Sequence, residues 1–214
     1  MTSPGGMVFV IDDDAPVRKS LERLLGSAGY DVELFQSAAE FLGRAPHPRP
    51  SCVIVDVQMP GLNGIDLQEA LIKRRREEQL VFITGHGNIP MCARAMKAGA
   101  VDFLPKPFQP KELMSCVERA LTRSAKQRSR AAEKKHARSL LDRLTPREFE
   151  VVQLLVTGML NKQVGAALGM AEKTVKCHRG RLMQKLQITS VPELIGLVRK
   201  AEVPQLAKSQ TKVR

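Results

Sequence analysis

The sequence has few of the features that mark disulfide-bonded, zinc-binding or membrane proteins. It contains four cysteines, and no two of them have the spacing of a metal site or of a redox-active pair. These residues, Cys52, Cys92, Cys116 and Cys177, are therefore expected to be reduced thiols. No apolar run approaches the roughly 18 residues that a membrane span requires, and residues 1–6 lack the apolar segment of a signal peptide. We expect a cytoplasmic protein with no membrane partner.

Excess positive charge is absent from the amino-terminal part of the chain. Residues 1–122 carry 14 Lys and Arg against 15 Asp and Glu, whereas residues 123–214 carry 20 against 7. A chain of 214 residues is long enough for one large domain or two small ones, and the uneven charge favours two. A strongly basic part is typical of a nucleic-acid partner, although a solvated basic face would have the same composition.

An apolar run with no helical period, Cys52–Val55, ends at the acid Asp56. Small and β-branched residues of this kind are typical of a strand buried on both faces of a parallel sheet. The proline, asparagine and glycines between residues 59 and 64 then predict irregular backbone. Two such strands side by side would bring at least three carboxylates together, which a bound cation would stabilise. The second run is Met7–Ile11, and it ends at Asp12, Asp13 and Asp14.

Two further strand patterns add a hydroxyl and an ammonium group. Leu80–Ile83 ends at Thr84, and Val101–Leu104 is followed by Lys106 between two prolines. In open α/β sheets ligands bind at the carboxyl ends of the strands, so these groups should share one cleft with the acids. Oxygen ligands with few carboxylates favour hydrated Mg²⁺. The sequence therefore predicts a magnesium site at this edge of the sheet.

Helical patterns alternate with the strand patterns, which include a further one at residues 32–35. Apolar residues recur at helical spacing after each strand. Five alternations of strand and helix predict an α/β fold, with a doubly wound parallel sheet and helices on both faces. The expected helices are residues 17–28, 38–42, 64–78, 88–98 and 110–123.

The remaining part of the chain has only helical patterns. Residues 123–143 contain no Gly or Pro and few repeating apolar positions, which favours a basic helix continued from the one before it. Thr145, Pro146 and Glu148 provide a cap, a first-turn proline and a capping-box glutamate. A turn at Gly169 between two short helices is typical of a helix-turn-helix. The four helices should begin near residues 146, 161, 172 and 192, the second of them capped by Asn161.

These motifs resemble those of two-component response regulators of the FixJ/NarL class. The receiver-like motifs are Asp12–Asp13, Asp56 with residues 59–64, Thr84–Gly85 and Lys106–Pro107. The motifs similar to a LuxR-type DNA-binding domain are Leu144–Glu148, Gly158, Asn161–Lys162, Leu168–Gly169, Thr174–Lys176 and His178. The resemblance implies a (βα)5 receiver domain at 5–122, a basic helical linker at 123–143, an all-α four-helix domain at 144–203 and a basic tail, expected to be disordered, at 204–214.

The resemblance implies that Asp56 is the phosphoacceptor. Its carboxylate would attack a phosphoryl group carried on a histidine of a sensor kinase, giving an acyl phosphate. Lys106, directed inward by a cis bond before Pro107, would supply a positive charge, and Thr84 would bind a phosphoryl oxygen. The chain would be a stoichiometric acceptor with slow self-catalysed dephosphorylation, and not an enzyme.

The same resemblance implies a metal ion and a conformational switch. Mg²⁺, or Mn²⁺ in its place, would offset the charge on the transferring phosphoryl group. A hydrogen bond from Thr84 to that group would draw its strand end inward and leave space into which the ring of Phe103 turns. A plain core role for Phe103 is the alternative. The implied metal ligands are Asp13, Asp56 and the backbone carbonyl of Gln58, with Asp12 acting mainly through water.

Surfaces for a second copy and for DNA follow from the same resemblance. A phosphorylated homodimer would bind a pseudo-palindromic promoter site, with the third helix of the carboxyl-terminal domain in the major groove. Ala171 stands where the family usually has a serine cap, and Gly180 leaves one base position without a side chain. The implied dimer face is Arg94, Met96, Lys97, Val101 and Asp102. The implied base-facing residues are Lys176, Cys177 and Gly180, and the candidates for phosphate contacts are Lys162, Thr174, Arg179, Arg181 and Lys185.

We therefore expect a transcription factor that is switched by phosphotransfer to Asp56. Its expected partners are a sensor histidine kinase and promoter DNA, with RNA polymerase as a further candidate. Two alternatives remain open. An atypical regulator would bind DNA whether or not Asp56 is phosphorylated. An aspartyl-phosphate phosphatase would need a second acid two residues beyond Asp56, and the sequence has Gln58 there.

Overall fold

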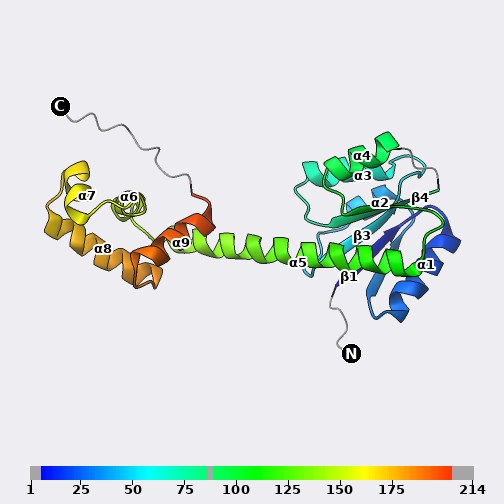
Figure 1. Cartoon of the computed structure of the whole chain (residues 1–214), viewed down its shortest axis with the longest axis horizontal. Coiled ribbons are helices and arrows are strands. Elements are labelled where there is room, and N and C mark those ends of the chain that lie inside the picture. Colours follow the sequence, from blue (N-terminus) through cyan, green and yellow to red (C-terminus); the bar gives the residue numbers. More distant parts are fainter. Residues whose placement is uncertain (1–5, 86–88, 204–214) are drawn as a thin grey trace. The chain divides into compact units, whose positions relative to one another are not determined.

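The computed structural model describes residues 6–85 and 89–203, and the chain divides into two units (Figure 1). The first unit is Met1–Ser129 and the second is Arg130–Arg214. The expected helix start at residue 88 and the expected tail at 204–214 lie outside the described residues. Within the described ranges, no helix is both long enough and apolar enough to cross a lipid bilayer.

A five-stranded parallel sheet forms the centre of the first unit, which confirms the predicted (βα)5 fold. All five residues of β1, an interior strand of the sheet, are buried, which explains its unbroken apolar run. Ile11 at the end of β1 pairs with Phe35 of β2 and with Val55 of β3, so these three strands end side by side. In sheet order, the strands are β2 (Asp31–Phe35), β1 (Met7–Ile11), β3 (Ser51–Asp56), β4 (Gln79–Thr84) and β5 (Asp102–Pro105).

Helices cover both faces of this sheet (Figure 1). On one face, α1 (Ala15–Ser27) and the first half of α5 (Pro110–Leu141) pack against Val8 and Val10 of β1. The other face is covered by α2 (Ala38–Gly43), α3 (Gly64–Lys73) and α4 (Ile89–Lys97). Since neighbouring residues of a strand point to opposite faces, both faces of β1 are apolar.

The helix expected at residues 64–78 is wrong at its end, because α3 stops at Lys73. Arg75 has a left-handed backbone, with φ 54°, and the chain then turns inward. Arg76 pairs with Glu78 at 2.5 Å, and the two side chains are only 5% and 4% exposed. Arg76 also donates a hydrogen bond to the carbonyl of Arg44 at 3.1 Å. Tertiary contacts of a buried ion pair therefore end a helix that the local sequence would have continued.

The segment expected as a linker is part of one continuous helix, α5, up to Leu141. Its first residues pack on the first unit, where the hydroxyl of Ser124 accepts a hydrogen bond from the N–H of Ser51 at 3.0 Å. Its last residues belong to the core of the second unit, in which Leu140 and Leu141 are 8% and 5% exposed. The ends of this segment are therefore structural parts of the two units.

The second unit packs the end of α5 against four helices. The capping box predicted at the start of the first of these is present: Glu148 accepts a hydrogen bond from the N–H of Thr145 at 2.8 Å, and the Thr145 hydroxyl accepts the N–H of Glu148 at 3.3 Å. Gly169, with φ 65°, closes the second helix in a left-handed conformation that glycine adopts without strain. The four helices are α6 (Pro146–Leu155), α7 (Asn161–Leu168), α8 (Glu172–Leu186) and α9 (Val191–Ala201).

Asn161 was expected to cap α7, but it is the first residue of that helix and not its cap. Leu160 occupies the cap position, and its N–H donates a hydrogen bond to the side chain of Gln163 at 2.8 Å. The side-chain oxygen of Asn161 instead accepts a long hydrogen bond from Arg179 of α8, at 3.4 Å. The helix begins at residue 161, as predicted, and the side chain of Gln163 satisfies the backbone N–H of the cap residue itself.

Candidate functional site

Three side chains from three strand ends meet at the carboxyl edge of the sheet. Nζ of Lys106, after β5, donates hydrogen bonds to Oδ2 of Asp12 at 2.8 Å and to Oδ1 of Asp56 at 2.9 Å. Asp12 and Asp56 are only 1% and 6% exposed, so the two carboxylates would repel each other without a nearby cation. The bond between Lys106 and Pro107 is cis, as expected. The ammonium group therefore stabilises both acids at once.

Burial raises the pKa of Asp56 above its usual value, although Lys106 stabilises the ionised carboxylate. Burial lowers the pKa of Lys106, but its hydrogen bonds to Asp12 and Asp56 outweigh this and raise the pKa overall. The lysine is therefore held in its charged form. The second oxygen of Asp56 accepts the backbone N–H of Gln58 at 2.8 Å. Both oxygens of Asp56 are thus hydrogen-bonded, which fixes the orientation of the carboxylate.

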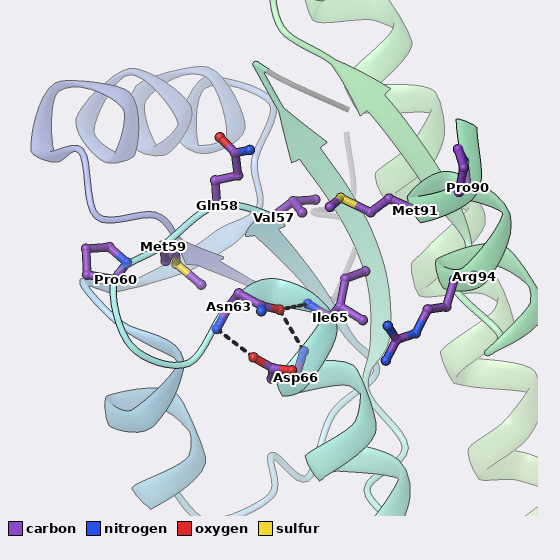
Figure 2. A pocket seen from close by; sticks show the side chains of 10 residues that line it. All are labelled: Val57, Gln58, Met59, Pro60, Asn63, Ile65, Asp66, Pro90, Met91 and Arg94. Carbon is purple, nitrogen blue, oxygen red and sulfur yellow. Dashed lines mark hydrogen bonds between the residues drawn. The ribbon is translucent and has the colours of Figure 1, made fainter. Parts of the chain in front are cut away.

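The loop between β3 and α3 lies directly against Asp56. Oδ1 of Asn63 accepts hydrogen bonds from the N–H groups of Ile65 and Asp66, both at 2.9 Å, and caps α3 (Figure 2). A Cβ atom on Gly64 would lie 2.5 Å from the backbone oxygen of Asp56. Only glycine permits this approach, so the Asn-Gly pair allows α3 to start against the end of β3.

The oxygen atoms at this edge fit a small hydrated cation. Asp12 and Asp56 converge on one cation, the Lys106 ammonium, and Mg²⁺ uses one or two carboxylates while keeping several waters. Of the three carboxylates predicted to share one cleft, the structure brings Asp12 and Asp56 to Lys106. Asp13 is exposed, and in residues 6–85 and 89–203 no three His, Cys, Asp or Glu side chains form a group that could hold a metal ion.

The two expected switch residues lie on neighbouring strands beside the acids. Thr84 is 1% exposed at the end of β4, and its backbone carbonyl accepts the N–H of Lys106 at 2.7 Å. Phe103 of β5 is half-buried, and its ring packs against Phe82 with centroids 6.0 Å apart. Because Phe82 lies two residues before Thr84 on β4, movement of this strand end would reach Phe103 directly.

Arg18 of α1 is a member of this site that the sequence analysis missed. Its Nη1 atom donates a hydrogen bond to the backbone carbonyl of Asp12 at 2.5 Å. Oδ1 of Asp12 also accepts the N–H of Asp14 at 2.9 Å. These bonds hold the loop after β1 in place. In the sequence, Arg18 could be recognised only by its position one turn into α1. A surface arginine could occupy the same position, so its contact with Asp12 was not predictable.

The residues expected at a dimer face lie on α4 and around the start of β5. Arg94 forms an ion pair with Glu69 of α3 at 2.5 Å, and Asp102 pairs with Arg119 of α5. Two of the expected charges are therefore paired within the chain. The exposed members of the set are Arg94, Met96 and Lys97, and the half-buried members are Val101 and Asp102.

A pocket of about 690 Å³ lies between the β3–α3 loop and α4 (Figure 2). Its apolar wall includes Met59 and Met91, and Arg94 extends toward it from α4. Gln58, two residues after Asp56, lines the pocket, whereas Asp56 itself does not. The pocket is therefore a neighbour of the acidic cluster and not a part of it.

In the second unit, α8 presents a polar, mostly basic surface. Its apolar residues Val175, Leu182 and Leu186 are buried, so the opposite side of the helix faces solvent. Ala171 occupies the cap position of α8 and makes no side-chain capping bond, as expected from the missing serine. Lys173, which the sequence analysis did not name, is also exposed in the first turn. The exposed residues among those expected to contact DNA are Lys162, Thr174, Lys176, Cys177, Gly180 and Arg181.

Two residues expected to contact DNA phosphates are half-buried and bonded inside the unit. Arg179 donates to Asn161, as described above. Lys185 donates a hydrogen bond from Nζ to Oε2 of Glu148 on α6 at 2.6 Å. The positions of these cations in a basic helix gave no sign of their partners, which lie far away in the sequence.

Two family models match the two parts of the chain. The model of the response regulator receiver domain matches residues 8–118. The model of bacterial regulatory proteins of the luxR family matches residues 142–198. The first match contains Asp12, Asp56 and Lys106, and the second contains all of α6, α7 and α8.

Known proteins resemble the chain over nearly its whole length. Nodulation protein W from Bradyrhizobium diazoefficiens is 43% identical over 211 residues, which cover 99% of this chain and 93% of that protein. The transcriptional regulatory protein FixJ from the same organism is 37% identical over 196 residues, covering 92% and 96%. The solved structure of the response regulator StyR has a TM-score of 0.81 and 45% identity, covering 91% of this chain and 98% of that one.

Proposed function

Because this chain belongs to the two-component response regulators, with a receiver domain joined to a LuxR-type DNA-binding domain, we propose that it is a transcription factor controlled by phosphorylation of Asp56. The observation that carries this proposal is the pair of hydrogen bonds from Lys106 to Asp12 and Asp56. A lysine held beside a buried carboxylate can offset the charge of an incoming phosphoryl group at the place where it arrives.

The phosphoryl donor is a phosphohistidine of a sensor histidine kinase. An oxygen of the ionised Asp56 carboxylate attacks phosphorus, and the bond between phosphorus and the histidine nitrogen breaks. The nitrogen keeps the electron pair of that bond, and Asp56 becomes an acyl phosphate. Lys106 exchanges its hydrogen bond with Asp56 for one with a phosphoryl oxygen. Asp13, Asp56 and the carbonyl of Gln58 would hold Mg²⁺ or Mn²⁺, with Asp12 acting mainly through water, and the ion would supply further positive charge near the phosphoryl oxygens.

The chain accepts the phosphoryl group stoichiometrically and does not turn over a substrate. A phosphatase that uses an aspartyl phosphate would need a second acid two residues after the nucleophile, and this position is Gln58. The backbone of Gln58 binds the nucleophile, which orients Asp56 without providing a proton donor for a leaving group.

Phosphorylation is transmitted through the ends of β4 and β5. Thr84 donates its hydroxyl hydrogen to a phosphoryl oxygen, and the β4 end moves inward. Phe103, packed on Phe82, turns into the vacated space. The receiver then forms a homodimer through Arg94, Met96, Lys97, Val101 and Asp102, which places two LuxR-type domains on one promoter site.

The exposed side of α8 reads the promoter in the major groove. Lys176, Cys177 and Gly180 face the bases, while Lys162, Thr174 and Arg181 contact phosphates. Arg179 has the same expected role, although its guanidinium lies near Asn161. RNA polymerase is a further partner of the DNA-bound dimer.

Acetyl phosphate with Mg²⁺ tests this proposal in two steps. Intact-mass measurement should detect one added phosphoryl group on the native chain and none on Asp56→Asn. Capture of genomic DNA fragments should then retain more DNA with the phosphorylated native chain than with the untreated chain. Absence of the adduct would overturn phosphorylation at Asp56. Equal retention before and after phosphorylation would instead establish the constitutive DNA-binding alternative.

A further inference from the structure

Two neighbouring residues at the start of α6 each hold one helix of the helix-turn-helix. Nη2 of Arg147 donates a hydrogen bond to the backbone carbonyl of Leu168, the last residue of α7, at 2.5 Å. Oε2 of Glu148 accepts a hydrogen bond from Nζ of Lys185, near the end of α8, at 2.6 Å. The first turn of α6 therefore contacts both helices of the pair.

The hydrogen bond between Glu148 and Lys185 joins a buried carboxylate to a partly exposed ammonium group. The side chain of Glu148 is 4% exposed, whereas that of Lys185 is 38% exposed. The same Glu148 oxygen also accepts hydrogen bonds from the N–H and the hydroxyl of Thr145, at 2.8 and 3.0 Å. A carboxylate this deeply buried is costly unless its charge is balanced. Lys185 supplies that balance.

Lys185 differs in this respect from Lys176 of the same helix. Lys176 is exposed and pairs with Glu172 on the same helix at 3.1 Å, with side chains 63% and 46% exposed. Such a pair contributes little and leaves the ammonium group available. Lys185 adjoins the buried Leu186 and is bound to another helix. The charge of Lys185 is therefore paired with a buried carboxylate of the same unit.

We propose that Glu148 is a positioning residue for DNA recognition, which fixes the orientation of α8 through Lys185, and that Lys185 does not contact DNA phosphates. This inference rests on the proposed binding of DNA by α8. The hydrogen bond from Arg147 to Leu168 acts in parallel on α7. The motif at the start of α6 thereby sets the angle at which the exposed side of α8 meets the groove.

A phosphate contact and a positioning contact differ in their dependence on salt. Each lost phosphate contact lowers the slope of log affinity against log salt concentration by about 0.9. If α8 is misplaced but the same phosphates remain in contact, the affinity for DNA falls and the slope stays the same. Lys185→Met should therefore lower the affinity about tenfold with the native slope, which corresponds to the loss of one charge-assisted hydrogen bond. Lys162→Met is the matched control, because Lys162 is an exposed lysine that is expected to contact a phosphate, and it should lower the slope.

The partner residue provides the second arm of the experiment. Glu148→Gln should lower affinity for the same DNA fragment with the native slope, although Glu148 lies on another helix. The double variant with Lys185→Met should cost less than the two single changes together, because both remove one interaction. Lys185→Arg, which keeps the charge, should retain most of the native affinity.

Hydrogen exchange of the DNA-free full chain separates this inference from the proposed function. Glu148→Gln and Lys185→Met should each increase exchange of the α8 amides, while Lys162→Met should leave it unchanged. Native exchange in both variants would overturn the inference, whether or not the chain binds DNA. A lower salt slope for Lys185→Met that matches the slope of Lys162→Met would also overturn it. Failure of the native chain to bind any DNA fragment would overturn the proposed function alone.

Discussion

Nζ of Lys106 lies 2.9 Å from Oδ1 of Asp56, a residue 50 positions earlier in the sequence. The contact exists because β3 and β5 run parallel and end at the same edge of the sheet, with β4 between them. Lys106 also binds Asp12, so one ammonium group balances two buried carboxylates. The same arrangement gives the receiver domain a nucleophile and a positive charge at one place.

Removal of the Lys106 charge should slow phosphorylation of Asp56. Lys106→Gln keeps a polar side chain but loses the ammonium group that offsets charge on the phosphoryl oxygens. A charge-assisted hydrogen bond of this kind contributes about 1.5–3 kcal/mol, which corresponds to a rate loss of about tenfold to a hundredfold. The rate can be followed by intact mass with acetyl phosphate as donor. Lys111→Gln, at an exposed lysine, should react at the native rate. Equal rates for both variants would contradict this role.

Gly64→Ala should disturb the loop that carries Gln58 and Asn63. The new Cβ would lie 2.5 Å from the backbone oxygen of Asp56, so the start of α3 must move away. Overpacking of this kind costs about 1–3 kcal/mol of unfolding free energy, measured by denaturant titration. Gly26→Ala is the control, because a Cβ at that helical position meets nothing within 4 Å. It should be neutral or stabilising, and a similar loss in both variants would exclude the steric explanation.

Arg76→Met should destabilise the first unit strongly. Glu78 would keep a carboxylate that is 4% exposed and would lose its cationic partner. Removal of one member of a buried ion pair costs about 3–5 kcal/mol. The double variant Arg76→Met with Glu78→Gln should recover part of the loss, because it also removes the buried charge. Lys73→Met, at an exposed position, should change the unfolding free energy little. A double variant no more stable than Arg76→Met would argue against this account.

Stability of the second unit should depend on pH through Glu148. Burial raises the pKa of this carboxyl, but hydrogen bonds from Lys185 and Thr145 outweigh it and hold the pKa below its usual value. The folded state therefore favours the ionised form, so the stabilisation is complete above the pKa of the unfolded chain and is lost as pH falls through the lowered pKa. The difference in unfolding free energy between native and Glu148→Gln should shrink on acidification over that range.

Truncation from the amino terminus should show whether the second unit needs the end of α5 to fold stably. A chain that begins at Arg130 keeps Leu140 and Leu141, which are buried in the core of this unit. A chain that begins at Leu144 loses both, and each buried leucine contributes about 1.5–3 kcal/mol. Thermal unfolding followed by circular dichroism should therefore give a cooperative transition for the longer chain and a much lower midpoint for the shorter one. Equal midpoints would mean that the end of α5 is dispensable.

The strand ends were predictable because each follows an unbroken apolar run. Asp12, Asp56 and Lys106 all adjoin such runs, and parallel strands must end at the same edge. The exposure of Asp13 was not predictable, because the chain leaves the regular strand after Ile11. The end of α3 was also mistaken, since the inward turn of Arg76 depends on Glu78 and on a carbonyl of a distant helix-end residue, Arg44.

The sequence by itself determined the order of strands and helices, the acids and the lysine at the strand ends, and the basic helices of the second unit. These features are encoded locally, in apolar periodicity, capping residues and charge. Only the tertiary structure decided that Lys185 binds Glu148, that Arg18 holds the loop of Asp12, and that both ends of the expected linker are packed. Such contacts join residues distant in sequence, and they depend on how whole elements pack together.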